Sequence, residues 1–417
     1  MKVAFYISNR NISSIDTSLV DKGNPGIGGS EYSVILISSL LSRNKDLEVV
    51  LLCDEIGIFP KHLKYVKCNN LIGAIQYYVK NDFDFLVVDS KLLLKHIVQR
   101  FYNVRFLAWA NCFISDSLLD FYSKQSNVYK IINVGKEQYY LTKDKSVYNK
   151  SCFIYNAVPI TVLNDYKGKL IPNGKREKNV VYVGSLILSK GFHLLAQAWP
   201  KVINKIPEAR LYVIGSGKLY SRNSKLGKWG IANEIYESRF MQYLAPNGKL
   251  MDSVKFLGIL GTEKYDILSQ CKVGVPNPSG LSETFGYTAV EMQFMDCLVT
   301  TIKCPGYLDT VYDKENLYNS PDELSTYIIE LLNSSTDVYP QVMEYINRFS
   351  VDEIVLEWEK LFEDLALKKR VNHIDNYILF TNGFMIYYLR YAWEYFFRVK
   401  LKAIYNFFRR NILKVSS

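Results

Sequence analysis

The feature that most constrains the fold of this chain is a repeated alternation of short apolar runs with longer segments of helical composition. Runs that are apolar almost throughout are typical of strands buried on both faces, as in a parallel sheet covered by helices. In the first half, strands are predicted at Val3–Ile7, Glu48–Cys53, Phe85–Asp89, Val104–Trp109, Lys130–Val134 and Cys152–Tyr155, with a helix over about Ser30–Leu41. This half is therefore predicted to be a doubly wound α/β domain.

A polar segment with proline and glycine, Asp165–Lys178, interrupts this pattern, which then starts again. The second set of strands is predicted at Val180–Val183, Ala209–Ile214, Val254–Leu257, Val273–Pro276 and Leu298–Ile302, with helices near 190–203, 263–270 and 286–296. A chain of 417 residues is longer than a single core usually supports. We predict two Rossmann-like domains, residues 1–165 and 166–350, that face a central cleft. A crossover helix at 351–370 and a basic, aromatic amphipathic tail at 371–417 are expected to follow.

The segment Pro276–Glu291 places a glycine-bearing turn and a helix start between two carboxylates, Glu283 and Glu291. The preceding strand would deliver this turn to the carboxyl edge of a parallel sheet, where such sheets bind ligands. A helix that begins near Phe285 would offer its first N–H groups to an anion. Glu283 is expected to accept hydrogen bonds from neutral hydroxyls, and Glu291 to hold vicinal hydroxyls such as those of a ribose. Alternatively, the first glutamate only stabilises the helix dipole and the second is solvated.

Two other segments could face the same ligand. The glycines of Gly26–Glu31 follow the first strand only after a long loop, so they are not a dinucleotide fingerprint. Gly28 and Gly29 could approach a phosphate or a sugar closely, or they could form a tight turn that Ser30 caps. Lys190 near a helix start could neutralise a diphosphate, although a solvated lysine is the alternative. The turn at Phe256–Gly261 could cover a flat base through its backbone.

Taken together, these pieces resemble retaining glycosyltransferases of the GT-B fold, family four (glycosyl transferases group 1). The resemblance spans about residues 1–365, and residues 181–312 carry its most specific part. There VGSLILSKG, LYVIGSG, VKFLGILG, PNPSGLSETFGYTAVEMQ and CPGYLDTV follow one another in the family's order. The resemblance implies transfer of a hexosyl or similar group from a UDP- or GDP-type donor to a hydroxyl acceptor with retention. It also implies a metal-independent reaction without a cofactor, in polysaccharide, cell-surface glycan or lipopolysaccharide-type assembly.

The resemblance also assigns roles to individual residues. Glu283 would bind the donor sugar, Glu291 the ribose and Lys190 the diphosphate, while Glu283, Lys190 and Asn111 would be the catalytic set. The donor-binding residues implied are Gly28, Gly29, Lys190, Ile259, Glu283, Thr284, Phe285, Gly286, Tyr287 and Glu291.

Two positions depart from the family's pattern. Ser185 stands where the family usually carries an arginine that pairs with the lysine on the diphosphate, and the basic stretch Lys218–Lys228 is a candidate source of a substitute. Asn111 stands near the family's histidine, and an amide can hydrogen-bond a hydroxyl but cannot exchange protons. These departures motivate one alternative, a catalytically silent sugar-nucleotide-binding partner protein. A nucleotide-sugar epimerase of the same architecture is another.

The net charge of +10 is concentrated toward the C-terminus, where 377–410 interleaves aromatic and basic residues. This pattern predicts a helix that lies in a membrane interface, since the uncharged run is too short to span a bilayer. The alternatives are packing on the body, an oligomer contact, or single-stranded nucleic acid, for which no RNA-binding module is present. The absence of a signal sequence and of CxxC pairs among seven cysteines predicts a cytoplasmic protein without a metal site, and the tail predicts a peripheral position on the membrane. The oligomeric state is left open.

Overall fold

The computed structural model describes residues 1–166, 168–335 and 339–366. Residues Met1–Glu363 form one compact unit, and a second unit begins at Asp364. The predicted tail at 371–417, with its membrane-surface segment at 377–410, lies outside the described residues. Within the described part, no helix is long and apolar enough to cross a membrane.

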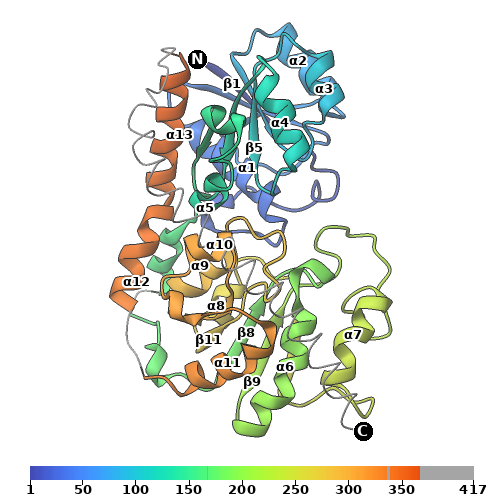
Figure 1. Cartoon of the computed structure of the whole chain (residues 1–417), viewed down its shortest axis with the longest axis vertical. Coiled ribbons are helices and arrows are strands. Elements are labelled where there is room, and N and C mark those ends of the chain that lie inside the picture. The colour runs from blue at the N-terminus through green and yellow to red at the C-terminus, as the bar shows by residue number, and fades with distance from the viewer. Residues whose placement is uncertain (167, 336–338, 367–417) are drawn as a thin grey trace, which may run out of the picture. The chain divides into compact units, whose positions relative to one another are not determined.

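The first sheet is doubly wound. Among the described residues its seven strands lie in the order β3-β2-β1-β4-β5-β6-β7, and every neighbouring pair is parallel. The strands are β1 (Lys2–Ile7), β2 (Glu48–Cys53), β3 (Lys64–Lys67), β4 (Phe85–Asp89), β5 (Phe106–Ala110), β6 (Val128–Asn133) and β7 (Ser151–Phe153). The helices between them are α1 (Gly29–Leu41), α2 (Leu71–Lys80), α3 (Lys95–Arg100), α4 (Asp116–Lys124) and α5 (Lys136–Tyr140). The order reverses between β1 and β4, as in dinucleotide-binding folds (Figure 1).

The second sheet repeats this plan with five strands in the described part, in the order β10-β9-β8-β11-β12. They are β8 (Asn179–Val183), β9 (Arg210–Ile214), β10 (Val254–Gly258), β11 (Val273–Gly274) and β12 (Leu298–Val299). The accompanying helices are α6 (Phe192–Lys205), α7 (Glu234–Leu244), α8 (Lys264–Leu268), α9 (Tyr287–Phe294), α10 (Pro305–Thr310), α11 (Leu324–Asn333) and α12 (Tyr339–Ile346). The predicted α/β class with two Rossmann-like sheets is therefore confirmed.

One predicted strand, Leu298–Ile302, was wrong as a single element. Its first half is β12, but Thr301–Ile302 forms β13, which pairs with β14 (Leu317–Tyr318) in a separate sheet. The cause is the buried hydroxyl of Thr301, which donates to the carbonyls of Pro276 and Asn277. These bonds hold the chain against the turn after β11, so it leaves the line of the second sheet.

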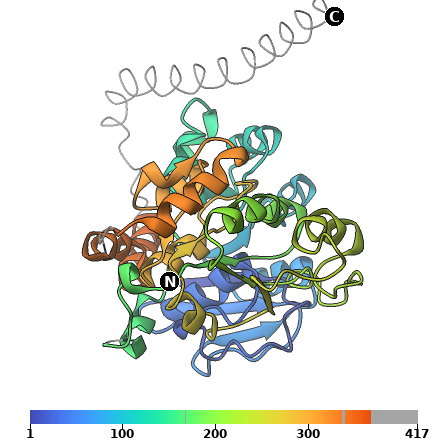
Figure 2. The ribbon, with the colours of Figure 1, turned by 90° about the horizontal axis from the view of Figure 1, so that it is seen from below.

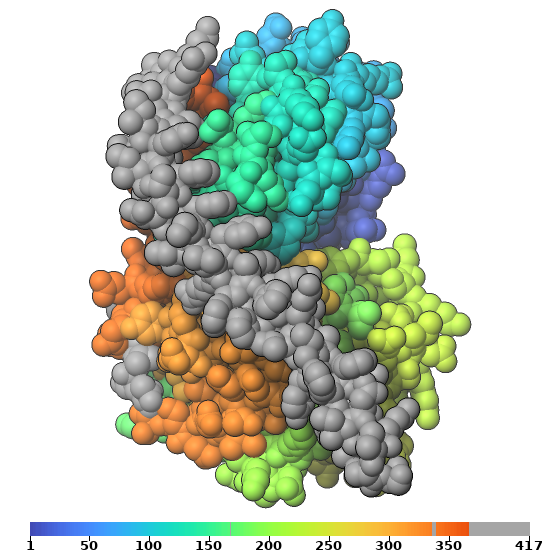
Figure 3. Space-filling view, viewed as in Figure 1, coloured from blue at the N-terminus to red at the C-terminus, as the bar shows by residue number. Residues whose placement is uncertain are grey.

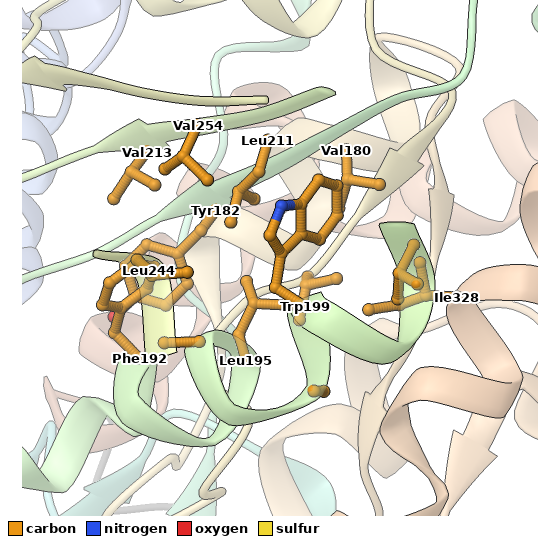
Figure 4. Packing of buried hydrophobic residues seen from close by; sticks show 14 of the residues in the cluster. Val180, Tyr182, Phe192, Leu195, Trp199, Leu211, Val213, Leu244, Val254 and Ile328 are labelled. Atoms are coloured by element: carbon orange, nitrogen blue, oxygen red, sulfur yellow. The ribbon is translucent and has the colours of Figure 1, made fainter. Parts of the chain in front are cut away.

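The core of the second sheet surrounds Trp199 of α6. This side chain is fully buried among residues that include Val180, Leu211 and Val254 of three neighbouring strands (Figure 4). Its indole Nε1 donates to Ser253 Oγ over 3.1 Å, so its polar atom is satisfied within the core. Helices α6 and α7 lie side by side on this core in both ribbon views (Figures 1 and 2).

Helix α13 (Val351–Ala366) returns from the second sheet to the first. Trp358 lies against Trp109 of β5, with ring centroids 4.9 Å apart, and against Phe5 of β1 at 5.7 Å. Phe362 also contacts the Phe5 ring. Ile354, Trp358 and Phe362 of this helix are buried, whereas Leu361 is only partly buried.

Truncation of this anchor should destabilise the folded chain. We expect Trp358→Ala to lower the free energy of unfolding by about 3–5 kcal/mol, because a fully buried aromatic side chain is lost and a cavity remains. The measurement is urea denaturation followed by circular dichroism. Leu356→Ala on the same helix is the matched control, since Leu356 is 60% exposed, and equal losses for the two variants would contradict the packing described.

Candidate functional site

A cavity of about 340 Å³ is lined by the loops that follow the strands of both sheets. Loops after β1, β4, β5 and β7 form its first wall, and loops after β8, β9, β10 and β11 form the second. Its size is within the range of small-molecule sites. Both sheets thus present their carboxyl edges to one space, which is where open α/β sheets bind ligands.

The turn after β11 has an unusual backbone that brings its helix start to the cavity. Ser282 has a φ of 57° and Gly286, the residue that caps α9, has a φ of 86°. A Cβ atom at Gly286 would lie 2.6 Å from the Tyr307 ring, so both conformation and space require glycine here. Helix α9 starts at Tyr287, two residues after the predicted Phe285, and Gly286, Tyr287 and Thr288 all line the cavity.

Glu283 and Lys190 form an ion pair on this wall. Glu283 Oε2 accepts hydrogen bonds from Lys190 Nζ at 2.9 Å and from Asn277 Nδ2 at 2.9 Å. The Glu283 side chain is only 13% exposed and the Lys190 side chain 21%, so the ion pair is partly shielded from water. Although burial opposes the charged form, the carboxylate of Glu283 raises the pKa of Lys190 above its usual value. The lysine is therefore a permanent cation at neutral pH.

Glu291 is held by a second buried lysine. Its Oε1 accepts from Lys264 Nζ at 2.7 Å and from the Tyr265 hydroxyl at 3.0 Å. The Lys264 and Glu291 side chains are 5% and 4% exposed. Glu291 was singled out from the sequence and lines the cavity. Lys264 was missed, because a lysine at a helix start is ordinarily solvated.

The first wall contacts the α9 turn directly. Thr284 Oγ1 donates to the Asn111 carbonyl over 2.7 Å, and the hydroxyls of Tyr287 and Ser33 lie 2.7 Å apart. Asn111 Nδ2 is buried without a hydrogen-bond partner in the described residues, and Asn111 lines the cavity. An unpaired amide donor at this place is suited to a ligand oxygen. Figure 3 shows the surfaces of the two sheet regions, blue to teal and green to orange, meeting.

Only one glycine of the predicted pair, Gly28 and Gly29, lines the cavity. Gly29 lines the cavity, whereas Gly28 is the residue that caps α1 and lies just behind the lining. A Cβ atom at Gly28 would lie 2.2 Å from Glu31 Oε2 and 3.1 Å from the Tyr220 ring, so a side chain there would displace the Glu31 carboxylate and press on the Tyr220 ring. The alternative in which Ser30 caps the helix was wrong, because the cap is Gly28 and no side chain bonds it.

The other predicted residues meet at the cavity. Those that line it are Gly29, Asn111, Lys190, Ile259, Glu283, Thr284, Phe285, Gly286, Tyr287 and Glu291. Residues that sequence reasoning did not assign also line it: Glu31, Lys91, Leu219, Tyr220 and Lys264.

The basic stretch that was expected to supply a charge in place of an arginine does not bring its basic residues to the cavity. Ser185 is buried, and its hydroxyl donates to the Ser216 carbonyl. The stretch Lys218–Lys228 contributes Leu219 and Tyr220 to the wall, and none of its basic residues is among the described lining residues. The cations that do line the cavity, besides Lys190, are Lys91 and Lys264. Within the described residues, no group of three or more His, Cys, Asp or Glu side chains is arranged to hold a metal ion.

Comparison with known proteins agrees with this architecture. The sequence profile of the family described as glycosyl transferases group 1 matches residues 177–334. No curated protein sequence matches the chain. Its fold is similar to that of Anabaena HepE in complex with UDP-glucose, with 15% identity, a TM-score of 0.63, and coverage of 87% of this chain and 99% of that one.

Two further structures share the fold at similar length. AviGT4, a glycosyltransferase involved in avilamycin A biosynthesis, has 13% identity and a TM-score of 0.58, over 88% of this chain and 98% of that one. A trehalose-6-phosphate protein from E. coli bound with UDP-2-fluoro glucose has 12% identity and a TM-score of 0.58, over 87% and 98% of the two chains. The shared architecture is GT-B, with two Rossmann-like sheets.

Gly286, which caps α9, should not tolerate a side chain. We expect Gly286→Ala to lower the free energy of unfolding by about 2–4 kcal/mol, because left-handed strain and overlap with Tyr307 add. Thermal and urea unfolding measure the loss. Gly174→Ala is the control, since a Cβ atom there meets nothing within 4 Å. A Gly286→Ala variant as stable as the control would show that the turn is not constrained as described.

Proposed function

We propose that the protein is a retaining glycosyltransferase of family four that moves a hexosyl or similar group from a nucleotide-diphosphate donor to a hydroxyl acceptor. The observation that carries the proposal is the wall on which Lys190, Glu283 and the start of α9 lie together. A lysine and a helix N-terminus suit a diphosphate, and a carboxylate suits sugar hydroxyls. The profile match over residues 177–334 supports the same class.

Donor binding would exchange the partners of the Lys190–Glu283 pair. Without a ligand, each of these charges neutralises the other over 2.9 Å. A diphosphate carries more negative charge than one carboxylate and would draw Lys190 toward its oxygens. Glu283, released from the lysine but still held by Asn277, could then accept hydrogen bonds from the donor sugar. One structural event thereby couples recognition of the diphosphate to recognition of the sugar.

The same groups would stabilise the leaving diphosphate. As the bond between the anomeric carbon and the phosphate oxygen breaks, negative charge grows on that oxygen next to Lys190 and the α9 N-terminus. With retention, the departing diphosphate takes the proton of the acceptor hydroxyl while that hydroxyl attacks the same face. Asn111 would act as a hydrogen-bond donor to a sugar oxygen through its unpaired Nδ2, and not as a base. Because a lysine and a helix supply the charge stabilisation, we propose a metal-independent reaction.

The nucleoside would occupy the other end of the wall. Glu291, fixed by Lys264 and Tyr265, would accept from the ribose hydroxyls, and the backbone at Ile259 would cover the base. We favour a UDP-type over a GDP-type donor, since HepE and the E. coli neighbour are described with UDP-glucose and UDP-2-fluoro glucose. The cation that assists Lys190 in place of the arginine would be Lys91, which lines the opposite wall. Its Nζ lies 3.6 Å from Asp89 Oδ2.

We further propose that the acceptor is a glycan or a lipid-linked hydroxyl in cell-surface polysaccharide assembly. This proposal rests on the basic aromatic sequence 377–410, which suits the surface of an anionic membrane on the cytoplasmic side. The direct test of the whole assignment is incubation with UDP-glucose, UDP-galactose, UDP-N-acetylglucosamine and GDP-mannose. Slow release of UDP or GDP supports a transferase. Binding without turnover indicates the silent partner protein that Ser185 and Asn111 suggest, and an isomerised donor indicates an epimerase.

If donor binding separates Lys190 from Glu283, substitutions of these two residues should have different effects on UDP affinity. Lys190→Met should weaken UDP binding by about tenfold, which is the loss of one charge-assisted contact. Glu283→Gln should bind UDP at least as tightly as the wild type, because Lys190 no longer has a competing carboxylate. The same Glu283→Gln variant should lower turnover of UDP-sugar by about 100-fold or more, since the sugar loses its charged acceptor.

Isothermal titration calorimetry with UDP and a coupled assay of UDP release measure these effects. Glu208→Gln is the control, because Glu208 is exposed and does not line the cavity. Equal weakening of UDP binding in the Lys190→Met and Glu283→Gln variants would argue that the pair is a structural link rather than a donor-binding device.

A further inference from the structure

The connection between β9 and α7 reaches from the second sheet to the first. We refer to residues 217–232 of this connection as the strap. Figure 1 shows it in light green, extending from the second sheet toward the elements of the first. Its sequence suggested only a source of positive charge, yet its basic residues are not among the described residues of the cavity wall.

The base of the strap is fixed by a buried carboxylate. Glu237 of α7 is 2% exposed and accepts hydrogen bonds from the backbone N–H groups of Trp229, Ile231 and Ala232, at 2.7, 2.8 and 3.1 Å. The backbone N–H of Gly217 donates to the Ile231 carbonyl at 2.9 Å and closes the base. These four hydrogen bonds fix the backbone at the base of the strap.

The tip of the strap is attached to the first wall. Arg222 Nη2 donates to the Gly26 carbonyl over 2.7 Å, and Asn11 Nδ2 donates to the Tyr220 carbonyl over 3.3 Å. Gly26 belongs to the loop that lines the cavity from the first sheet. The strap therefore joins the two walls of the cavity.

Tyr220 is the residue that this attachment brings to the cavity. Its ring lies so close to Gly28 that a Cβ atom there would be 3.1 Å from Tyr220 Cε1, and the residue lines the cavity while remaining 41% exposed. Desolvation of the phenol raises its pKa; the Lys190 cation opposes this shift, and the carboxylates of Glu283 and Glu31 add to it. Tyr220 lines the same cavity as Lys190 and Glu283, so its phenol shares that space with the ion pair.

From this placement we infer that Tyr220 covers the sugar end of the cavity and that its ring keeps water from the anomeric carbon of the bound donor. The inference rests on the proposed function. Without this cover, a water oxygen attacks the anomeric carbon, the bond to the diphosphate breaks, and free sugar and UDP leave, with the water proton passing to solvent. Exclusion of water is a general requirement of sites that hold reactive donors. Tyr220 is therefore a positioning and protecting residue, and the Arg222–Gly26 bond holds it in place.

The test is the rate of UDP release from UDP-glucose in water, divided by the number of UDP-binding sites measured by calorimetry. We expect Tyr220→Ala to raise this rate about tenfold, because the ring that excludes water is lost. Tyr220→Phe keeps the ring and should stay within about 1.5-fold of the wild type. Arg222→Met should raise the rate by about threefold, since it releases the strap from Gly26.

Lys225→Met is the matched control for Arg222→Met, because it removes a charge from an exposed position of the same strap. General damage to the site would lower hydrolysis, so an increase cannot come from partial unfolding. A Tyr220→Ala rate equal to or below that of a wild type that binds UDP would overturn this inference alone. A wild type that neither binds UDP nor releases it from any UDP-sugar would overturn the proposed function and this inference with it.

Discussion

The Lys190–Glu283 ion pair exists because β8 and β11 are neighbours in the second sheet. Each residue follows one of these strands, so residues separated by 93 positions meet at the carboxyl edge. The other contacts of the turn after β11 depend on the same placement. Thr284, next to Glu283, bonds Asn111 of the first wall. Tyr287, at the start of α9, bonds Ser33 on the same side. Displacement of the pair would therefore disturb the cavity wall and the contact between the two sheet regions together.

The cavity also has a balanced charge. Among the described residues, its lining carries three lysines and three glutamates: Lys91, Lys190, Lys264, Glu31, Glu283 and Glu291. Lys190 and Lys264 are each paired with a glutamate, and Lys91 with Asp89 behind the wall. Pairs of this kind keep the cations charged and oriented in a site where unpaired burial would be costly. Under the proposed function, a diphosphate would have to compete with these carboxylates for the lysines, so its own negative charge would be needed for binding.

The sequence predicted those elements whose position depends on a local pattern of residues. Continuous apolar runs identified the long strands of both sheets, since burial on both faces leaves a clear signal. It failed at Lys64–Lys67, a mostly exposed edge strand without an apolar run, and at Thr301, whose tertiary bonds redirect the chain. The glutamates and Lys190, which line the cavity, were singled out from local sequence and from the resemblance. Lys264 and Tyr220 were not, because their place depends on contacts with Glu291 and with the loop at Gly26 and Gly28, far away in the sequence.

The central claim is that a nucleotide diphosphate takes Lys190 away from Glu283. A crystal structure of the full chain with bound UDP tests this most directly. The account predicts Lys190 Nζ at about 3 Å from a phosphate oxygen, as in other charge-assisted hydrogen bonds, and Glu283 still bonded to Asn277 but no longer to the lysine. An intact Lys190–Glu283 pair at its present 2.9 Å, with UDP bound elsewhere on the chain, would contradict it.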